Sequence, residues 1–211
     1  MKKKSQYLVV GLGRFGSAVA TALVEQGMQV LAIDRNIEVV EAHRSRLTDV
    51  VRGDAMDAEV LERLGVADFD AAIITIGDDV KVSSVVTMHL KELGVKYVIS
   101  KASDDFHGRM LARLGADKVI FPERDMGRRV AHNLVSNKIM DFIELSPDYS
   151  LMEMHPRPEW VGVPLKELNL RGKHRINVVA VRSGGEVNAM PDPDTVIGAD
   201  DVMLVVSQAG A

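Results

Sequence analysis

The stretch Tyr7-Leu-Val-Val-Gly-Leu-Gly-Arg-Phe-Gly16 decides the fold of this chain. Its first four residues are apolar, as in a strand buried on both faces, and three glycines follow at the spacing Gly-x-Gly-x-x-Gly. Residues 15–26 then space their apolar side chains as a helix does, and Gly27 follows as a C-terminal stop. Strand, glycine turn and helix in this order predict the first βα unit of an α/β sheet.

The glycines of this stretch and a later acid have separate predicted roles. Gly11 allows the tight turn, Gly13 lets the backbone approach a diphosphate, and Gly16 lets helix and strand pack closely. Asp34 ends the second apolar segment, where a carboxylate accepts hydrogen bonds from a ribose diol. The combination predicts an adenine-nucleotide site, against the alternative of a glycine-rich turn with only a structural role.

The same alternation continues after this first unit. Further strands are expected at 29–33, 49–51, 71–76, 96–101 and 118–121. Further helices are expected at 37–47, 58–64, 82–93 and 106–114. Together with residues 7–10, these strands predict an α/β fold with a Rossmann-like doubly wound parallel sheet, whose ligand crevice lies at the carboxyl ends of the strands.

The pattern changes after Pro122. Residues 126–140 are expected to form a longer connector helix with an apolar stripe. The rest of the chain is expected to hold a segment at 151–154, a short helix at 164–168, a hairpin of strands at 177–181 and 186–189, and a closing segment at 202–206. We therefore predict three parts: the nucleotide-binding sheet at 1–124, the connector at 125–144 and a small C-terminal α+β domain at 145–211.

Composition excludes several classes of protein. Of the 211 residues 46% are hydrophobic, which is enough to build a core and excludes wholesale disorder. The net charge of −4 argues against a nucleic-acid partner, and the lack of cysteine removes thiol nucleophiles, disulfides and thiolate metal sites. No apolar run approaches the roughly 18 residues of a membrane-spanning helix, so a membrane role is expected to come through a partner.

Three charged residues near the expected crevice each have two interpretations. Arg14, inside the glycine loop, either neutralises a terminal phosphate or is a solvated side chain. Asp54, after the third strand, either accepts a hydrogen bond from an adenine amino group or is a turn or N-cap residue before the next helix. Glu123, after the sixth strand, either meets a cationic partner, which is a divalent cation or Arg14 of a neighbouring subunit, or is a helix-start carboxylate stabilised by the helix dipole.

No catalytic residues are predicted. Tyr97 and Lys101 have the Tyr-x-x-x-Lys spacing of short-chain dehydrogenases, but that chemistry needs both on one helical face, and residues 97–101 are expected to form a strand. The histidines show no metal-binding spacing; they stand at positions 43, 89, 107, 132, 155 and 174. A binding module is therefore favoured over an NAD(H)-dependent oxidoreductase or redox sensor, and over a transcription factor, for which a helix-turn-helix and a basic face are missing.

These features resemble the RCK family, in which TrkA-N and TrkA-C domains form the cytosolic gating subunits of Ktr-type potassium uptake systems. The motifs that carry the resemblance extend over nearly the whole chain, and the arginine inside the glycine loop is the most discriminating of them. They are Val10–Gly16, Asp34, Ile74–Gly77, Lys91–Gly94, Ser100–Ala102, Leu114–Asp117, Pro122–Met126, Arg171 and Ile176–Ala180.

The resemblance implies a nucleotide-responsive regulator. Homodimers would assemble into an octameric ring in the cytoplasm and dock on a membrane potassium-translocating subunit at the inner face of the membrane, with ATP activating and ADP inactivating. On matched positions, Arg14 would meet the γ-phosphate, Asp34 the ribose and Asp54 the adenine. The implied nucleotide site also includes Phe15, Arg35, Ala55, Ile76, Gly77 and Lys101.

The same resemblance implies two further sites. Glu123 would take part in a divalent-cation site, for Mg²⁺ or Ca²⁺, between paired subunits, and would also border the nucleotide. The C-terminal domain resembles a dimeric receptor for cyclic di-AMP, which would inhibit the system. Its matching positions are Arg171, Asn177, Val178 and Pro191.

Overall fold

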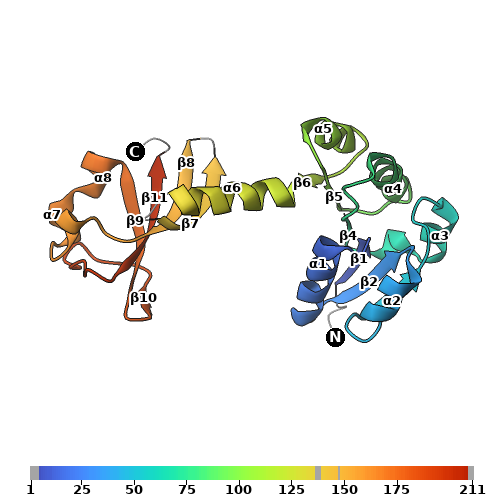
Figure 1. The fold of residues 1–211 in the computed structure, drawn as a ribbon, viewed down its shortest axis with the longest axis horizontal. Helices are drawn as coiled ribbons and strands as arrows, with labels where there is room; N and C mark the ends of the chain where they lie inside the picture. Colours follow the sequence, from blue (N-terminus) through green and yellow to red (C-terminus); the bar gives the residue numbers. More distant parts are fainter. Residues whose placement is uncertain (1–4, 136–138, 147, 209–211) are drawn as a thin grey trace. The chain divides into compact units, whose positions relative to one another are not determined.

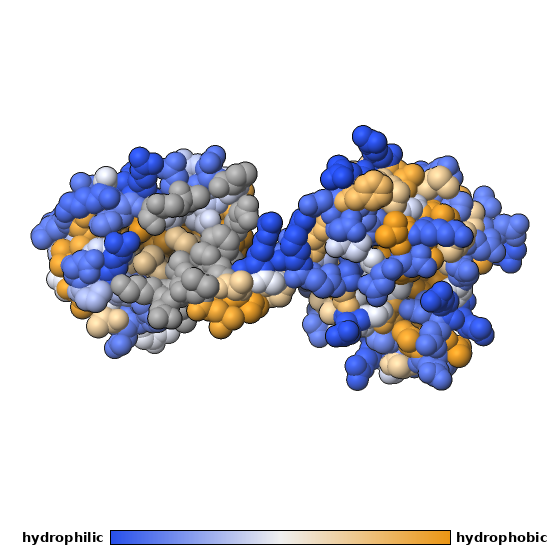
Figure 2. All heavy atoms as spheres, turned by 45° about the horizontal axis from the view of Figure 1, so that its top comes forward, coloured by the Kyte–Doolittle hydropathy of each residue, from blue (hydrophilic) through white to orange (hydrophobic). Residues whose placement is uncertain are grey.

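The fold is taken from a computed structural model that describes residues 5–135, 139–146 and 148–208 (Figure 1). The chain divides into two compact units, Met1–Pro122 and Glu123–Ala211. Most of the surface that Figure 2 shows is hydrophilic, with smaller apolar patches on each unit. Within the described residues, no helix is long and apolar enough to span a bilayer.

The first unit is built on a six-stranded parallel sheet with the order β3-β2-β1-β4-β5-β6. Its strands are β1 (Gln6–Val10), β2 (Gln29–Asp34), β3 (Asp49–Arg52), β4 (Ala71–Ile74), β5 (Val98–Lys101) and β6 (Lys118–Ile120). Its helices are α1 (Arg14–Glu25), α2 (Ile37–His43), α3 (Ala58–Arg63), η1 (Val66–Asp68), α4 (Val80–Glu92) and α5 (Asp105–Arg113). The predicted Rossmann-like doubly wound sheet is confirmed.

Helices cover both faces of this sheet. Leu8 of β1 packs in one apolar cluster with Leu61 of α3 and Leu90 of α4. The next residue, Val9, belongs to a second cluster, with Ala20 of α1. Because successive residues of a strand point to opposite faces, β1 is buried on both sides and reads as an uninterrupted apolar run.

Four helices of the first unit begin with a side chain that accepts a backbone N–H group. The caps are Asn36 for α2, Asp57 for α3, Asp79 for α4 and Asp104 for α5. Helix α1 differs, because Gly13 precedes it, no side chain caps it and its first turn has no acidic residue. Its first N–H groups therefore lack the acceptor that the other helices carry.

The second unit is built on a five-stranded antiparallel sheet with the order β10-β9-β11-β8-β7. Its strands are β7 (Ile139–Ser146), β8 (Tyr149–Met154), β9 (Ile176–Ser183), β10 (Glu186–Asn188) and β11 (Val202–Gln208). Its helices are α6 (Pro122–Val135), η2 (Pro158–Trp160), α7 (Leu165–Leu168) and α8 (Leu170–His174). One apolar cluster forms its core and includes Trp160, Ile197, Met203 and Val205.

The connector helix expected over residues 126–140 was wrong at both ends. Helix α6 begins earlier, at Pro122, and ends at Val135. Residues 139–146, inside the segment predicted as the connector at 125–144, form β7 and pair with β8. Ile139 fits the apolar stripe of the expected helix, but apolar and polar residues alternate from Ile143 to Ser146, which is the period of a strand. Pairing with β8 decides between the two periods.

Candidate functional site

The loop between β1 and α1 is tightly held at Gly11 and Gly16. Gly11 has φ +91°, and its N–H donates to the Ile33 carbonyl oxygen in β2 at 2.9 Å. An added Cβ on Gly16 would collide with the Gly11 carbonyl oxygen and lie 2.5 Å from Thr75 Oγ1. Both positions therefore exclude a side chain for reasons of the fold itself.

Gly13 is held by neither of these constraints. Its φ is −64°, which other residues adopt, and an added Cβ would meet no atom of the described chain within 4 Å. It is exposed and stands directly before α1, whose first N–H groups have no side-chain cap. Since the fold does not require glycine here, the open space suits the close approach of an anion such as a phosphate to the start of α1.

Arg14 and Phe15 form the first turn of α1. Arg14 is exposed, and its guanidinium has no hydrogen-bond or ion-pair partner among the described residues. Phe15 is half-buried. A cation at the N-terminus of an uncapped helix adds to the partial positive charge of the helix end, so this side of the loop favours an anion.

Asp34 connects β2 to the glycine loop. One of its carboxylate oxygens accepts the Leu12 N–H at 2.7 Å, and the other accepts the Asn36 N–H at 2.9 Å. The side chain is half-buried. Because a carboxylate has about four acceptor positions, two remain for hydroxyl groups such as those of a ribose. The predicted ribose acceptor thus has a structural role in addition.

The segment after β3 lies beside this acid. The Gly53 N–H donates to the Asp34 carbonyl oxygen at 3.0 Å, and Asp54 follows. Asp54 Oδ1 accepts the Met56 N–H at 2.9 Å, and Ala55 is buried. The turn interpretation of Asp54 is therefore met, and its second oxygen is not used by that turn.

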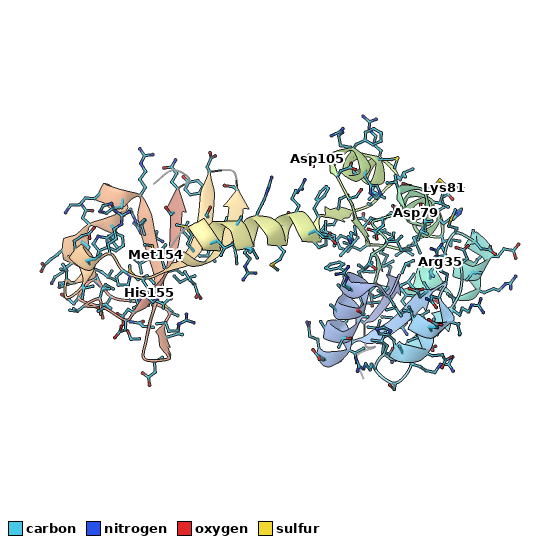
Figure 3. All side chains as sticks on the ribbon, viewed as in Figure 1. Arg35, Asp79, Lys81, Asp105, Met154 and His155 are labelled. Atoms are coloured by element: carbon cyan, nitrogen blue, oxygen red, sulfur yellow. The ribbon has the colours of Figure 1, made fainter. Side chains whose placement is uncertain are left out.

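Other predicted residues lie at the ends of neighbouring strands. An added Cβ on Gly11 would lie 2.8 Å from Ile76 Cγ1, so the segment after β4 borders the loop. An added Cβ on Gly77 would lie 2.8 Å from Lys101 Cε, so the largely buried Lys101 side chain passes over Gly77. Arg35 follows β2 at the same sheet edge and is exposed (Figure 3). The structure brings most of the predicted nucleotide residues to the carboxyl edge of the sheet.

Glu123 belongs to the second unit. It lies exposed in the first turn of α6, together with Asp125. Within the described residues, no group of three or more histidine or acidic side chains is placed to hold a metal ion. The helix-start interpretation of Glu123 is met, and its role toward a cation stays a prediction.

The second unit brings two of its predicted residues together. Arg171 Nη2 in α8 donates to Asn177 Oδ1 in β9 at 2.6 Å, and both side chains are exposed. Val178 is half-buried against the core, and Pro191 is half-buried in its loop. Sequence reasoning missed α8 and Asn169, whose side chain caps that helix while its backbone has φ +46°. The sequence Asn169-Leu-Arg-Gly is the signal, because asparagine tolerates this conformation.

His107 was singled out in the sequence only as one of the histidines. It is buried, its Nδ1 accepts the Ser103 N–H at 3.2 Å, and its Nε2 lies 2.9 Å from Ser83 Oγ. Burial lowers the pKa of His107, the nearby Asp104 carboxylate opposing that shift. A neutral ring with both nitrogens engaged ties α5 to α4 and serves the packing of the unit.

Comparison with known proteins agrees with both units. A TrkA-N domain matches residues 7–122, and a TrkA-C domain matches residues 151–211. The Ktr system potassium uptake protein C of Bacillus subtilis (strain 168) is 40% identical over 203 residues, covering 96% of this chain and 92% of that protein.

Solved structures agree on the fold. The structure titled GsuK channel bound to NAD has a TM-score of 0.69 at 18% identity and covers 99% of this chain and 38% of its own. The structure titled GsuK bound to ADP has a TM-score of 0.53 at 20% identity, covering 60% of this chain and 34% of its own. At these identities the likeness establishes the fold alone.

Proposed function

This chain belongs to the RCK family, in which a TrkA-N domain is followed by a TrkA-C domain, and on that premise we propose that it is a cytoplasmic regulatory subunit of a potassium uptake system. The proposal follows the Ktr system protein that matches over almost the whole of both chains. It assigns the chain no catalysis. Its task would be to bind an adenine nucleotide and to change the state of a membrane potassium-translocating partner.

The observation that carries the proposal is the set of groups gathered at the carboxyl end of β1. An uncapped helix, an open space beside Gly13, the exposed Arg14 and the Asp34 carboxylate meet at one edge of the sheet. Helix and arginine suit phosphate, and the carboxylate suits a ribose. The groups suited to the phosphates and the group suited to the ribose therefore lie at the same edge of the sheet, where one nucleotide would contact both.

The regulatory step rests on unequal affinities. A nucleotide that binds two conformations with different affinity shifts their populations by that difference and no more. In our proposal ATP favours the active state and ADP the inactive one, and Arg14 supplies the difference by meeting the γ-phosphate, which ADP lacks. Asp34 and Asp54 would hold the ribose and adenine, which both nucleotides share.

The proposal includes assembly with further copies. Helix α6 exposes an apolar stripe of Met126, Val130 and Leu134, with relative accessibilities of 54%, 50% and 76%. The spacing of four residues places these side chains on one side of the helix. We propose that this stripe pairs subunits into dimers that build an octameric ring, with Glu123 at a Mg²⁺ or Ca²⁺ site between them.

We further propose that the second unit binds cyclic di-AMP and inhibits transport. The support is the pair Arg171 and Asn177, in which the amide oxygen holds the guanidinium in place. An arginine fixed in this way is prepared to bind a phosphate with its remaining donors. Val178 and Pro191 would supply apolar contacts to the bases.

A sensor of NAD(H), or an NAD(H)-dependent oxidoreductase, is the second candidate. It is favoured by the likeness in fold to the GsuK channel that was solved bound to NAD. It is also favoured by Asp34, which suits the ribose of NAD as well as that of ATP. In this candidate Arg14 would face the diphosphate bridge instead of a terminal phosphate. The two candidates differ in ligand and share the site.

Calorimetric titration with ATP, ADP, NAD and NADH, with and without Mg²⁺ or Ca²⁺, tests the proposal. We expect ATP and ADP to bind more tightly than NAD(H), and Asp34→Ala to weaken both. Preferential binding of NAD(H) would replace the nucleotide-gating proposal by the second candidate. Unchanged ATP affinity in Asp34→Ala would remove the ribose assignment.

A further inference from the structure

A single peptide group of the glycine loop is held from two sides. Thr75 Oγ1, just after β4, donates to the Gly11 carbonyl oxygen at 2.8 Å and lies 3.1 Å from the Val10 carbonyl oxygen. The Leu12 N–H donates to Asp34 Oδ2 at 2.7 Å. The Gly11 carbonyl and the Leu12 N–H belong to the same planar trans peptide, so they point in opposite directions.

The two side chains come from the two strands that flank β1. Asp34 ends β2, Thr75 follows β4, and the sheet order places β1 between them. Thr75 is 8% exposed, and its own N–H donates to the Val10 carbonyl oxygen at 3.0 Å. The hydroxyl is therefore fixed by the backbone of the sheet and does not depend on an exposed, mobile side chain.

The Thr75 hydroxyl packs closely against the glycine loop and the first turn of α1. An added Cβ on Gly16 would lie 2.5 Å from Thr75 Oγ1. The orientation of the Gly11–Leu12 peptide thus sets the path of the chain into Gly13 and α1, where the uncapped N–H groups begin. Turning this peptide would redirect those groups away from a ligand.

We infer that Thr75 is a positioning residue for the phosphates of the nucleotide: with Asp34 it clamps the Gly11–Leu12 peptide and so aims the amides of the loop and of α1. The inference rests on the proposed nucleotide site and adds to it a residue that acts through the backbone of the glycine loop. Asp34 has two tasks, the ribose and the clamp, whereas Thr75 has only the clamp. Variants of Thr75 therefore separate the clamp from the ribose contact.

The experiment compares Thr75→Val, which keeps the shape and loses the donor, with Thr75→Ser, which keeps the donor. Thr87→Val is the matched control, because Thr87 is also a buried threonine of the first unit, and its hydroxyl bonds to the Ser83 carbonyl oxygen at 2.7 Å and to Ser100 Oγ at 2.9 Å, away from the glycine loop. Affinities for ADP and adenosine are measured by calorimetry, alongside thermal unfolding. Exchange of the Leu12 amide is followed in the ligand-free protein.

We expect Thr75→Val to bind ADP roughly three- to tenfold more weakly, as the loss of one hydrogen bond predicts, with adenosine affinity unchanged. Thr75→Ser should restore ADP affinity. Thr87→Val should lower the unfolding temperature but leave the ADP affinity unchanged. The Leu12 amide should exchange faster in Thr75→Val than in the wild type or Thr87→Val, because its peptide turns more freely. If Thr75→Val does not fold, Thr75→Ala takes its place.

Two results for the ADP affinity of the variants would overturn the inference. Either Thr75→Val binds ADP as the wild type does, or Thr75→Val and Thr87→Val lose ADP affinity in proportion to their loss of stability. A wild type that binds none of the nucleotides would refute the proposed function, and the role of Thr75 in binding with it. Unchanged Leu12 exchange in Thr75→Val would refute the clamp, and with it the inference, while leaving the proposed nucleotide site in place.

Discussion

The two candidate sites of this protein are made in different ways. In the first unit the site is made of backbone, at the turn after β1, and side chains such as Asp34 and Thr75 hold that backbone in place. In the second unit it is made of exposed side chains, Arg171 on a short helix and Asn177 on a strand. A change at a residue that shapes or holds the loop, such as Gly16 or Thr75, should therefore damage the fold in the first site, whereas a change in the second should damage only the binding.

The largest expected effect comes from Gly16→Ala. The added methyl group would meet the Gly11 carbonyl oxygen and Thr75 Oγ1, so the loop or the helix must move. We expect the free energy of unfolding to fall by about 3 kcal/mol, measured by urea denaturation. The matched control is Gly13→Ala, whose methyl group meets nothing, with a change within about 0.5 kcal/mol. Equal losses in the two variants would contradict this account of the loop.

Arg171→Ala tests the other half of the comparison. If the second unit binds cyclic di-AMP as proposed, removing the guanidinium should weaken that binding by about 2 kcal/mol through the loss of a charged hydrogen bond to phosphate, while leaving ADP affinity and stability unchanged. Lys173→Ala removes the same charge from an exposed position of α8 and serves as the control. A parallel loss in Lys173→Ala would mean that only the overall charge of α8 acts on the ligand.

Arg14→Ala should have a smaller and more selective effect. We expect the preference between ATP and ADP to change by about 1.4 kcal/mol, or tenfold, because one charged contact with the γ-phosphate is lost. Calorimetry with both nucleotides measures it, with Arg63→Ala on α3 as a control of equal charge. If Arg14→Ala loses the same affinity for ATP and ADP, the γ-phosphate assignment falls.

The smallest expected effect is that of pH on the first unit. Burial lowers the pKa of His107, so the folded protein protonates this ring at a lower pH than the unfolded chain, whose histidine has a pKa of about 6.5. Stability should therefore fall as the pH drops from 7 to 5.5, since the unfolded state binds more protons there than the folded state. Thermal unfolding at each pH measures the slope, and His107→Gln should reduce it. An equal slope in His107→Gln would contradict this reading of the buried ring.

The carboxylates with shifted pKa values act in a lower range of pH. A backbone hydrogen bond from His107 lowers the pKa of Asp104, and one from Val98 lowers that of Asp117. Stabilisation by these groups is present above the unfolded pKa of about 3.9 and is lost as the pH falls through their folded pKa. Asp104 and Asp117 therefore do not contribute to the change in stability between pH 7 and 5.5.

The first unit could be predicted from sequence because its rules are local. Buried runs such as Tyr7–Val10, glycines at fixed spacing and an acid after the second strand lie within one βα unit and its neighbour. Thr75 could not be assigned a role in this way, because its hydrogen bond to Gly11 joins residues 64 positions apart. Only the folded sheet shows that β4 lies beside β1.

The second unit was harder to predict from sequence, because its elements are short or are decided by contacts between residues far apart in the chain. Strand β7 shares apolar residues with the end of the helical pattern before it, and only pairing with β8 selects the strand. Helix α8 has five residues, too few for a helical period to be recognised. The contact between Arg171 and Asn177 depends on the turn at Arg175, where φ is +54°.

The missing cap of α1 also bears on how long the protein survives. A ligand that binds only the folded state adds stability in proportion to the logarithm of its concentration above the dissociation constant. Here the ligand would supply the acceptor that Asn36, Asp57, Asp79 and Asp104 supply to the other helices. Empty subunits would open more often and meet proteases sooner than loaded ones. The abundance of the protein in a cell would then follow its supply of nucleotide.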